Sequence, residues 1–132
     1  MRSKLTGRRA PDMPTPRTRL GDMGEAAARR FLEAQGYRIL AAKFRCPWGE
    51  LDLVAQDGDD LVFVEVRTRR SEAFGAPEES LTPAKVRHLL AACQHYLQAH
   101  PRPEAAWRID LVSVLPGRHG TVINHLRHAI EV

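Results

Sequence analysis

Residues 49–69 alternate apolar and polar side chains on both sides of a short polar run, in the order GELDLVAQDGDDLVFVEVRTR. The polar run at residues 57–60, DGDD, is a turn signal because Gly and Asp tolerate the backbone angles of tight turns. The side chains of a strand alternate between its two faces. The pattern therefore predicts an antiparallel hairpin, in which a loop of those four residues would pair Gln56 with Leu61.

In that register the two faces of the hairpin differ in polarity. A slip of one residue would move charged side chains onto the apolar face, so the pattern itself favours this pairing. The apolar face would hold Leu51, Leu53, Ala55, Val62, Val64 and Val66. The mixed face would hold Val54, Leu61 and Phe63 near the turn, and Glu50, Asp52, Glu65 and Arg67 at the far end.

The acids of the mixed face are unusual, because Asp and Glu form strands poorly and are seldom buried without a partner. The register places Asp52 opposite Glu65 and Glu50 opposite Arg67. Two carboxylates about 5 Å apart repel by roughly 3 kcal/mol at an effective dielectric near 20. A shared proton, a basic neighbour, or a divalent cation such as Mg²⁺ or Mn²⁺ would relieve that repulsion. A surface ion-pair cluster with Arg67 and Arg69 is the alternative, but the apolar flanks favour a metal.

A first helix is predicted over residues 21–35, ended by Gly36, and a strand over 37–44 follows it. Glu25 lies at the margin of the helix face, and spacing alone favours an exposed acid paired with Arg29 one turn further on. The apolar stripe expected to pack on the sheet comprises Met23, Ala27, Phe31 and Ala34.

A second helix is predicted to open with Thr82 as its N-cap and Pro83 at its first position, after a loop over 71–80. Lys85 falls in the first turn, where a cation opposes the helix dipole, so it is equally well a solvated lysine or one placed for a ligand. Closing strands are predicted over 107–114 and 121–126, joined by a turn at 116–120. The buried stripe of the second helix is expected to be Val86, Leu89, Leu90, Cys93 and Leu97.

The remaining charged and metal-ligating residues receive structural interpretations. Arg108 and Asp110, two apart in a strand, predict an ion pair at a sheet edge or against a helix. Cys46 and Cys93 are widely spaced and form no CxxC pair, so neither a disulfide framework nor a thiolate zinc site is indicated. The histidines lack a spacing typical of zinc and are interpreted as surface or phosphate-contact residues: His88, His95, His100, His119, His125 and His128.

The composition is that of one globular domain of 132 residues, with a net charge of +4 that is unevenly placed. Residues 1–19 hold six Arg or Lys against Asp12, a net +5, whereas residues 20–132 hold fourteen against fifteen acids, a net −1. We therefore divide the chain into a basic, Pro-containing disordered arm over 1–19 and a folded domain over 20–132. The arm could bind nucleic acid or act as a solubilising tail. No apolar run approaches the ~20 residues of a membrane span, and the basic N-terminus lacks an apolar signal core, so we expect a cytoplasmic protein and no membrane contact.

Several short motifs together resemble a known family. They are Gly24-Glu25-Ala26-Ala27, Gly36-Tyr37, Gly49-Glu50-Leu51-Asp52-Leu53, Phe63-Val64-Glu65-Val66-Arg67 and Arg108-Ile109-Asp110. In this combination, over about residues 20–129, the chain resembles the YraN-like family of small bacterial proteins. That family is similar to the archaeal Holliday junction resolvases and to the restriction-endonuclease-like PD-(D/E)xK superfamily. The resemblance implies an α/β fold with a restriction-endonuclease-like core, a mixed sheet of about five strands flanked by helices.

The resemblance also implies roles for individual residues. Asp52 and Glu65 would be metal-binding acids, and Glu25 would join them as the first-helix glutamate of resolvase-like members. Arg67 stands where the superfamily has a lysine; arginine can stabilise charge on a phosphate, but it stays protonated and cannot act as a base. Lys85 would take over that position if it projects toward the same site. The expected catalytic set is thus Glu25, Asp52, Glu65, Arg67 and Lys85, and the expected nucleic-acid contacts are Lys43, Arg45, Arg69 and Arg70.

The function expected from this set is metal-dependent hydrolysis of phosphodiester bonds, with Mg²⁺ or Mn²⁺ as cofactor and branched DNA as a candidate substrate. Glu50 would bind the metal through water or orient the cluster. DNA is favoured over RNA, and resolvase-like relatives imply a symmetric homodimer. Two alternatives stay open: a nucleic-acid-binding protein that does not cut, and a protein-interaction module whose acids are structural.

Overall fold

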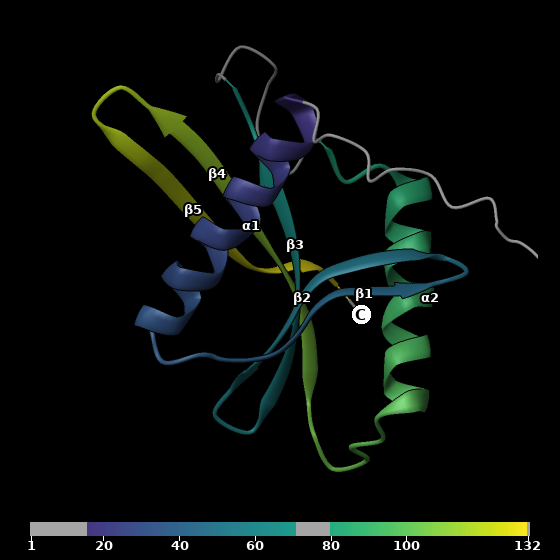
Figure 1. Cartoon of the computed structure of the whole chain (residues 1–132). Helices are drawn as coiled ribbons and strands as arrows, with labels where there is room; N and C mark the ends of the chain where they lie inside the picture. Colours follow the sequence, from purple (N-terminus) through teal and green to yellow (C-terminus); the bar gives the residue numbers. More distant parts are fainter. Residues whose placement is uncertain (1–15, 71–79, 132) are drawn as a thin grey trace, which may run out of the picture.

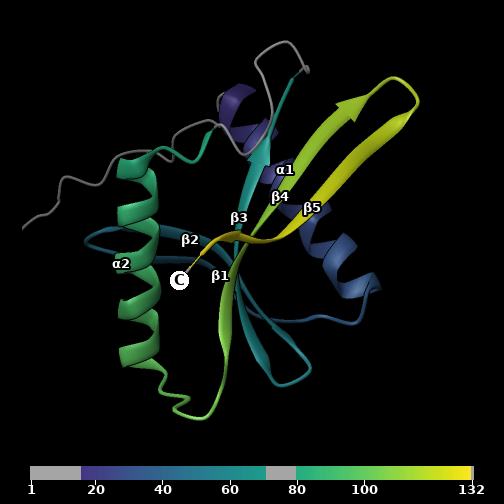
Figure 2. The same ribbon diagram turned by 180° about the vertical axis from the view of Figure 1, so that it is seen from behind.

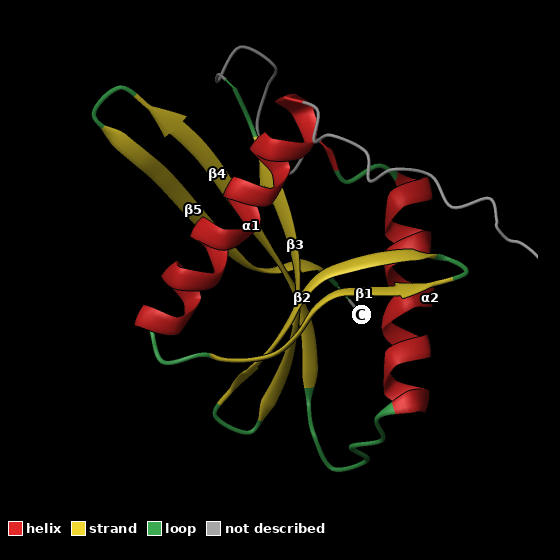
Figure 3. Ribbon diagram, viewed as in Figure 1, coloured by secondary structure: helices red, strands yellow, loops and turns green. Residues whose placement is uncertain are grey.

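The structure, a computed structural model, describes residues 16–70 and 80–131 and places a mixed five-stranded sheet between two helices (Figures 1 and 3). The sheet order is β1-β2-β3-β4-β5; β3 and β4 are parallel and joined through α2, and the other neighbours are antiparallel. This confirms the expected α/β architecture, which is compatible with a restriction-endonuclease-like core. The elements are α1 (Pro16–Ala34), β1 (Arg38–Cys46), β2 (Gly49–Asp57), β3 (Asp60–Thr68), α2 (Pro83–Ala99), β4 (Trp107–Gly117) and β5 (Gly120–Ile130).

Each face of the sheet packs on one helix, and the view from behind shows α1 and α2 well separated across it (Figure 2). On the α2 side, Leu89, Ala92, Cys93 and Tyr96 pack on Phe63 and its neighbours. On the α1 side, Ala28 and Leu32 pack on an aliphatic layer that includes Leu53, Val62, Val64 and Val112. Alternation along β3 therefore sends successive side chains to different helices.

Helix α1 differs from the prediction in its start and in its buried face. It begins at Pro16, so the predicted boundary between residues 19 and 20 falls inside the helix; residues 1–15 lie outside the described residues. Met23 is 50% exposed, whereas Ala28 and Leu32 are fully buried. Ala27 and Phe31 of the predicted stripe are half-buried and pack against the same core, so the stripe is partly correct. Near its N-terminal end the helix approaches the sheet closely, because a Cβ on Gly24 would lie 1.8 Å from Thr68 Oγ1.

Helix α2 confirms its predicted start. Thr82 is the N-cap, its side chain accepts a hydrogen bond from Lys85 N at 3.2 Å, and Pro83 is the first helical residue. The predicted stripe is correct for Leu89 and Cys93. Val86, Leu90 and Leu97 are partly buried and pack against the same core, while Ala92 and Tyr96 complete the buried face.

The hairpin keeps the predicted register near its turn and departs from it further away. Gln56 pairs with Leu61 as predicted, and Asp57 also pairs with Asp60, so the turn proper contains two residues. The ladder between β2 and β3 ends at the pair Leu53–Val64. Beyond that pair, β2 continues with β1 alone as its neighbour, and the sheet opens.

The opening coincides with a kink in β1 and β2. Lys43 adopts a left-handed backbone angle, φ 54°, and the pairing of Ala42 with Leu53 and of Phe44 with Leu51 skips the residues between them. Leu53 packs on the α1 side, but Leu51 packs on the α2 side. The prediction that Leu51 and Leu53 share one apolar face was therefore wrong, because at the kink the strand rotates and the side chain of Leu51 points to the α2 side instead of the α1 side.

Arg108 and Asp110 form the predicted ion pair, with Arg108 Nε donating to Asp110 Oδ1 at 3.0 Å. The pair is buried in β4, the fourth of five strands, rather than at a sheet edge. His125 Nε2 lies 2.7 Å from Asp110 Oδ2 with only 7% of its side chain exposed, so its interpretation as a surface residue was wrong. Burial raises the pKa of Asp110, but the hydrogen bonds from His125, Arg108 and the His128 N–H outweigh it and hold that pKa below its usual value.

In the described residues, no helix has the length and apolar character needed to cross a membrane.

Candidate functional site

The candidate site lies where β2 separates from β3. Because the ladder stops at Leu53–Val64, the Val66 N–H has no backbone partner on β2, and it donates instead to Asp52 Oδ2 at 2.8 Å. The register predicted from sequence would continue with Asp52 opposite Glu65. The two side chains do lie near each other: both line one pocket, and the charge of Glu65 helps to raise the pKa of Asp52. Where the strands separate, the Asp52 side chain therefore accepts the hydrogen bond from Val66 that a β2 carbonyl would accept in a continuous ladder.

Three carboxylates meet at this opening. Oxygens of Glu25, Glu50 and Asp52 all lie within 4.8 Å of one another, with Glu25 supplied by α1 and the other two by β2. Lys43 Nζ contacts Glu25 Oε1 at 2.8 Å and Asp22 Oδ1 at 3.1 Å. Glu25 is therefore turned toward the sheet. Its interpretation as a surface acid paired with Arg29 was wrong, because Arg29 pairs with Glu33.

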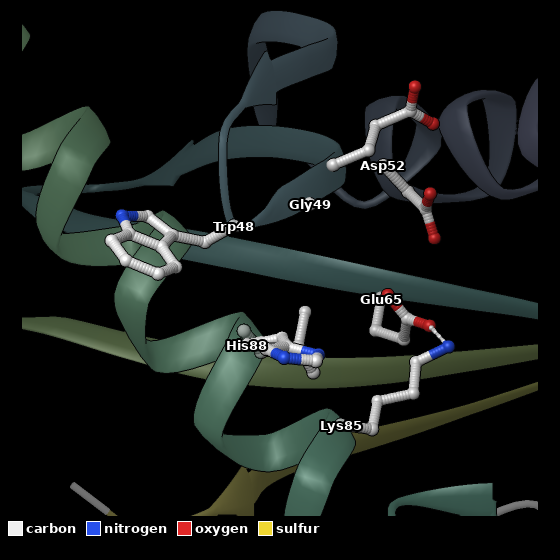
Figure 4. Close-up of a pocket in the computed structure, with 8 residues that line it drawn as sticks. Trp48, Gly49, Asp52, Glu65, Lys85 and His88 are labelled. Carbon is white, nitrogen blue, oxygen red and sulfur yellow. Dashed lines mark ion pairs between the residues drawn. The ribbon is translucent and has the colours of Figure 1, made fainter.

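A lysine reaches the same site from the opposite face of the sheet. Lys85, in the first turn of α2, places Nζ 2.7 Å from Glu65 Oε2, and the Glu65 side chain is only 8% exposed (Figure 4). The sequence left Lys85 open between a solvated lysine and one placed for a ligand. The contact with a buried acid shows that it points into the site. The open sheet is what allows α1 and α2, on opposite faces, to supply side chains to one place.

Asp52 differs from the other acids of the site in having no cationic partner among the described residues. Lys43 pairs with Glu25, Lys85 pairs with Glu65, and Arg45 Nε pairs with Glu50 Oε2 at 2.9 Å. Burial and, next, the charge of Glu65 raise the pKa of Asp52 to about 8, against the hydrogen bond from Val66. A cation bound beside Asp52 would favour its ionised form and lower this pKa.

A pocket of about 440 Å³ opens beside Asp52 and Glu65. Figure 4 shows Asp52, Glu65 and Lys85 at one side of it and Trp48 and His88 at the other. Ligand pockets in proteins usually measure about 300–1,000 Å³. The pocket is therefore large enough for a small ligand or for one part of a larger one.

The other predicted site residues lie around this centre rather than in it. Arg67 is exposed on β3 and does not line the pocket, and Glu50 does not lie opposite it. Arg69 follows β3, with its N–H bonded to Val114 O at 2.8 Å, and Arg70 is exposed at the end of the described segment. Lys43 and Arg45, predicted as nucleic-acid contacts, are the residues that pair with Glu25 and Glu50.

Four residues that line the pocket were not predicted as site residues from the sequence: Trp48, Gly49, His88 and Leu89. Trp48 received no role from the sequence pattern, and His88 was interpreted only as a surface or phosphate-contact residue. The available signal was the position of Trp48: an aromatic residue in a turn, directly before an acid-containing strand. The role of Lys43 as the partner of Glu25 depends on the kink in β1, which no local pattern predicts.

The donor set suits a hard divalent cation. Carboxylate oxygens are the ligands that Mg²⁺ and Mn²⁺ prefer. The three residues whose ligand atoms lie closest together, Glu25, Glu50 and Asp52, all offer carboxylate oxygens, and none of the three is Cys or His. The uncompensated Asp52 is the residue in this set that a cation would stabilise most. Glu25, Glu50 and Asp52 can therefore hold such an ion, with Glu65 beside them.

Fold and site together define an α/β protein with an acidic cluster at the opening of a mixed sheet, compatible with a restriction-endonuclease-like core. Residues 24–114 match the uncharacterised protein family UPF0102, a stretch that contains every acid of the site and Lys85. The chain belongs to this family, which confirms the resemblance to YraN-like proteins.

Relatives of the same family match over nearly their whole length. A UPF0102 protein of Roseiflexus castenholzii is 48% identical over 118 residues, covering 87% of this chain and 95% of the relative. A UPF0102 protein of Chloroflexus aurantiacus is 47% identical over 114 residues, 86% of this chain and 92% of the relative. A UPF0102 protein of Herminiimonas arsenicoxydans is 43% identical over 117 residues, 89% of this chain and 90% of the relative.

Proposed function

We propose that this protein is a metal-dependent nuclease that hydrolyses phosphodiester bonds in nucleic acid, with DNA favoured over RNA. The observation that carries the proposal is Asp52: a carboxyl group with no cation of its own among the described residues, with an oxygen within 4.8 Å of oxygens of Glu25 and Glu50, and beside Glu65. A structural ion-pair cluster would pair this acid too. An acid left uncompensated among other acids favours a site that takes up a cation.

In this proposal Asp52 and Glu25 hold Mg²⁺ or Mn²⁺, with Glu50 or Glu65 completing the set. A bound divalent ion lowers the pKa of a coordinated water and neutralises the phosphate. Asp52 itself is fixed by the Val66 N–H at 2.8 Å, so its second oxygen keeps a defined direction. The backbone bond thus orients the acid that matters most.

Lys85 is proposed to do what the superfamily lysine does. Its Nζ lies 2.7 Å from Glu65 Oε2 and beside the pocket, so it can donate to a phosphate oxygen as charge builds there. Arg67, exposed and outside the pocket, contributes to attraction of the phosphate backbone together with Arg69 and Arg70. The arginine in the motif then does not abolish the chemistry, because a lysine reaches the site from α2.

The test is cleavage of labelled single-stranded, duplex and branched DNA, and of RNA, in Mg²⁺ and in Mn²⁺. We expect metal-dependent cleavage by the full chain and a loss of at least about a hundredfold in Asp52→Asn. Glu33→Gln is the matched control, since Glu33 is an exposed acid on the same helix as Glu25 and pairs only with Arg29 among the described residues. Absence of cleavage on all substrates in both metals would reject the nuclease.

A second candidate, nucleic-acid binding without cleavage, is favoured by the arginine at position 67. Residues 1–15 carry four Arg or Lys against one acid and lie outside the described residues. If that segment supplies the affinity, binding should fall steeply with salt, persist in Asp52→Asn, and collapse when residues 1–15 are deleted. A resolvase-like activity on two strands would further require two copies of the site, and light scattering of the full chain would reveal the proposed homodimer.

A further inference from the structure

Trp48 is the most exposed large apolar side chain in the described residues, at 56% of its surface. The second tryptophan, Trp107, behaves differently: it is half-buried and packs edge-on against Phe63 with ring centroids 5.6 Å apart. Exposing an indole forfeits a large amount of apolar burial. Trp48 therefore stays outside the core while its counterpart packs inside, which leaves its indole face available to a ligand.

The turn holds Trp48 in place. Cys46 and Gly49 are the last pair of the β1–β2 ladder, and Cys46 Sγ contacts Gly49 O at 3.5 Å. Gly49 has φ 139°, an angle that side chains rarely tolerate, and Pro47 restricts the other flank. A side chain on such a tight turn is presented in a limited range of positions, so less conformational entropy is lost when a ligand binds it.

The indole also borders the proposed site. Trp48 and His88 form one side of the pocket, and Asp52, Glu65 and Lys85 form the other (Figure 4). The centre of a protein–protein interface is depleted in charged residues, whereas this tryptophan lines one pocket with acids, a lysine and a histidine. An aromatic face on one side and charged groups on the other match a ligand with a flat apolar part and an anionic part. A nucleotide has both.

We propose that Trp48, with His88 below it, stacks an unpaired base whose phosphate lies toward Asp52 and Lys85. Bases inside a duplex already stack on their neighbours, so an indole reaches a base face only where the base is unpaired or terminal. The inference rests on the proposed function and deepens it. It assigns the substrate class as nucleic acid with an unpaired nucleotide at the site: a single strand, a flap or the branch point of a junction.

The test is equilibrium binding of three labelled probes in Ca²⁺, with a gel to verify that the strands stay intact. The probes are a short oligothymidylate, the same strand with abasic positions, and a blunt duplex of the same length. Trp48→Ala should weaken oligothymidylate binding about 5- to 150-fold, the range of one base–aromatic stack, and leave the other two probes unchanged. Trp48→Phe should restore most of the affinity, since a phenyl ring still stacks.

Val122→Ala is the matched control, because Val122 is 54% exposed on β5 and does not line the pocket. Oligothymidylate should also quench tryptophan emission in the wild-type chain and not in Trp48→Phe, where only Trp107 remains. Thermal unfolding verifies that each variant is folded.

Two results would overturn the inference while leaving the nuclease proposal intact. One is Trp48→Ala binding oligothymidylate as tightly as the wild type, which is the result expected if the indole serves a protein partner. The other is an equal loss on the abasic strand. If the wild-type chain neither binds nor cleaves any of the probes, the proposed function itself fails.

Discussion

At the scale of single residues, the site is organised by how charge is shared among four acids. Three of them have a cationic partner: Lys43 holds Glu25, Arg45 holds Glu50, and Lys85 holds Glu65. Among the described residues Asp52 has no cationic partner; it accepts a hydrogen bond from the Val66 N–H, and burial and the neighbouring acids oppose its ionisation. The free-energy cost of ionising the site therefore falls mainly on Asp52.

The first prediction concerns pH and stability. The pKa of Asp52 is raised to about 8 in the folded chain, above about 3.9 for an unfolded aspartate. Between about pH 4 and 8 the folded state keeps a proton that the unfolded state gives up. The contribution of Asp52 to stability is therefore present at low pH and lost as pH rises through about 8. Urea unfolding in EDTA at about pH 5 and 8 should show this decline in the wild type and a smaller one in Asp52→Asn.

Because other groups titrate in the same range, the informative quantity is the difference between the two proteins. An identical pH profile for wild type and Asp52→Asn would mean that this acid is ordinary. Glu33→Gln should reproduce the wild-type profile, since its exposed carboxylate lies outside the site.

The second prediction concerns Lys43. Its ammonium group bonds to Glu25 and Asp22, and the bond to Glu25 is the chief reason that the pKa of Lys43 is raised, so it stays charged. A bound divalent ion would share Glu25 with this cation. Lys43→Gln should therefore raise Mn²⁺ affinity by up to about fivefold, the scale of one exposed ion pair.

Calorimetric titration of Mn²⁺ measures that change directly. Arg29→Gln is the control, because it removes a cation from α1 that pairs with Glu33 outside the site. Weaker Mn²⁺ binding in Lys43→Gln would show that the lysine supports the acids rather than competing for them.

At the scale of elements, the position of α1 decides whether Glu25 reaches the site. The sequence predicted the helix and part of its buried face: Ala27 and Phe31 pack against the core, but an apolar-spacing rule also selects Met23, which is exposed, and passes over Gly24 and Ala28. At position 24 the structure requires a residue without a side chain, because the helix passes so close to Thr68 that only glycine fits. That choice is made by the partner strand, which local sequence does not contain.

The third prediction follows from this contact. Gly24→Ala would place a Cβ 1.8 Å from Thr68 Oγ1, so the helix or the strand end must move. Overpacking of this kind costs about 1–3 kcal/mol, and moving α1 also displaces Glu25. Gly21→Ala is the matched control: nothing lies within 4 Å of its added Cβ, so better helix propensity should stabilise it by up to about 1 kcal/mol. Chemical denaturation distinguishes the two, and equal effects would contradict the close packing.

At the scale of the whole molecule, the sequence predicted what is local and missed what arises between elements. The hairpin turn follows from alternation and from a DGDD run, and the start of α2 follows from Thr82 and Pro83. The opening between β2 and β3 does not: Asp52 and Glu65 follow directly after the last pair, Leu53–Val64, but acids in a strand pattern do not reveal whether the ladder ends at them or continues past them. Lys85 could be predicted as a residue of the first turn, but its contact with Glu65 depends on how α2 packs.

The central claim is that this opening holds a divalent cation through Asp52. Calorimetric titration of Mn²⁺ into the full chain at about pH 8, where Asp52 is near half ionised, tests it without a choice of substrate. We predict binding at a single site in the wild type and in Glu33→Gln, and a loss of affinity of at least about tenfold in Asp52→Asn. Binding of equal strength in Asp52→Asn, or no binding in the wild type, would contradict the account.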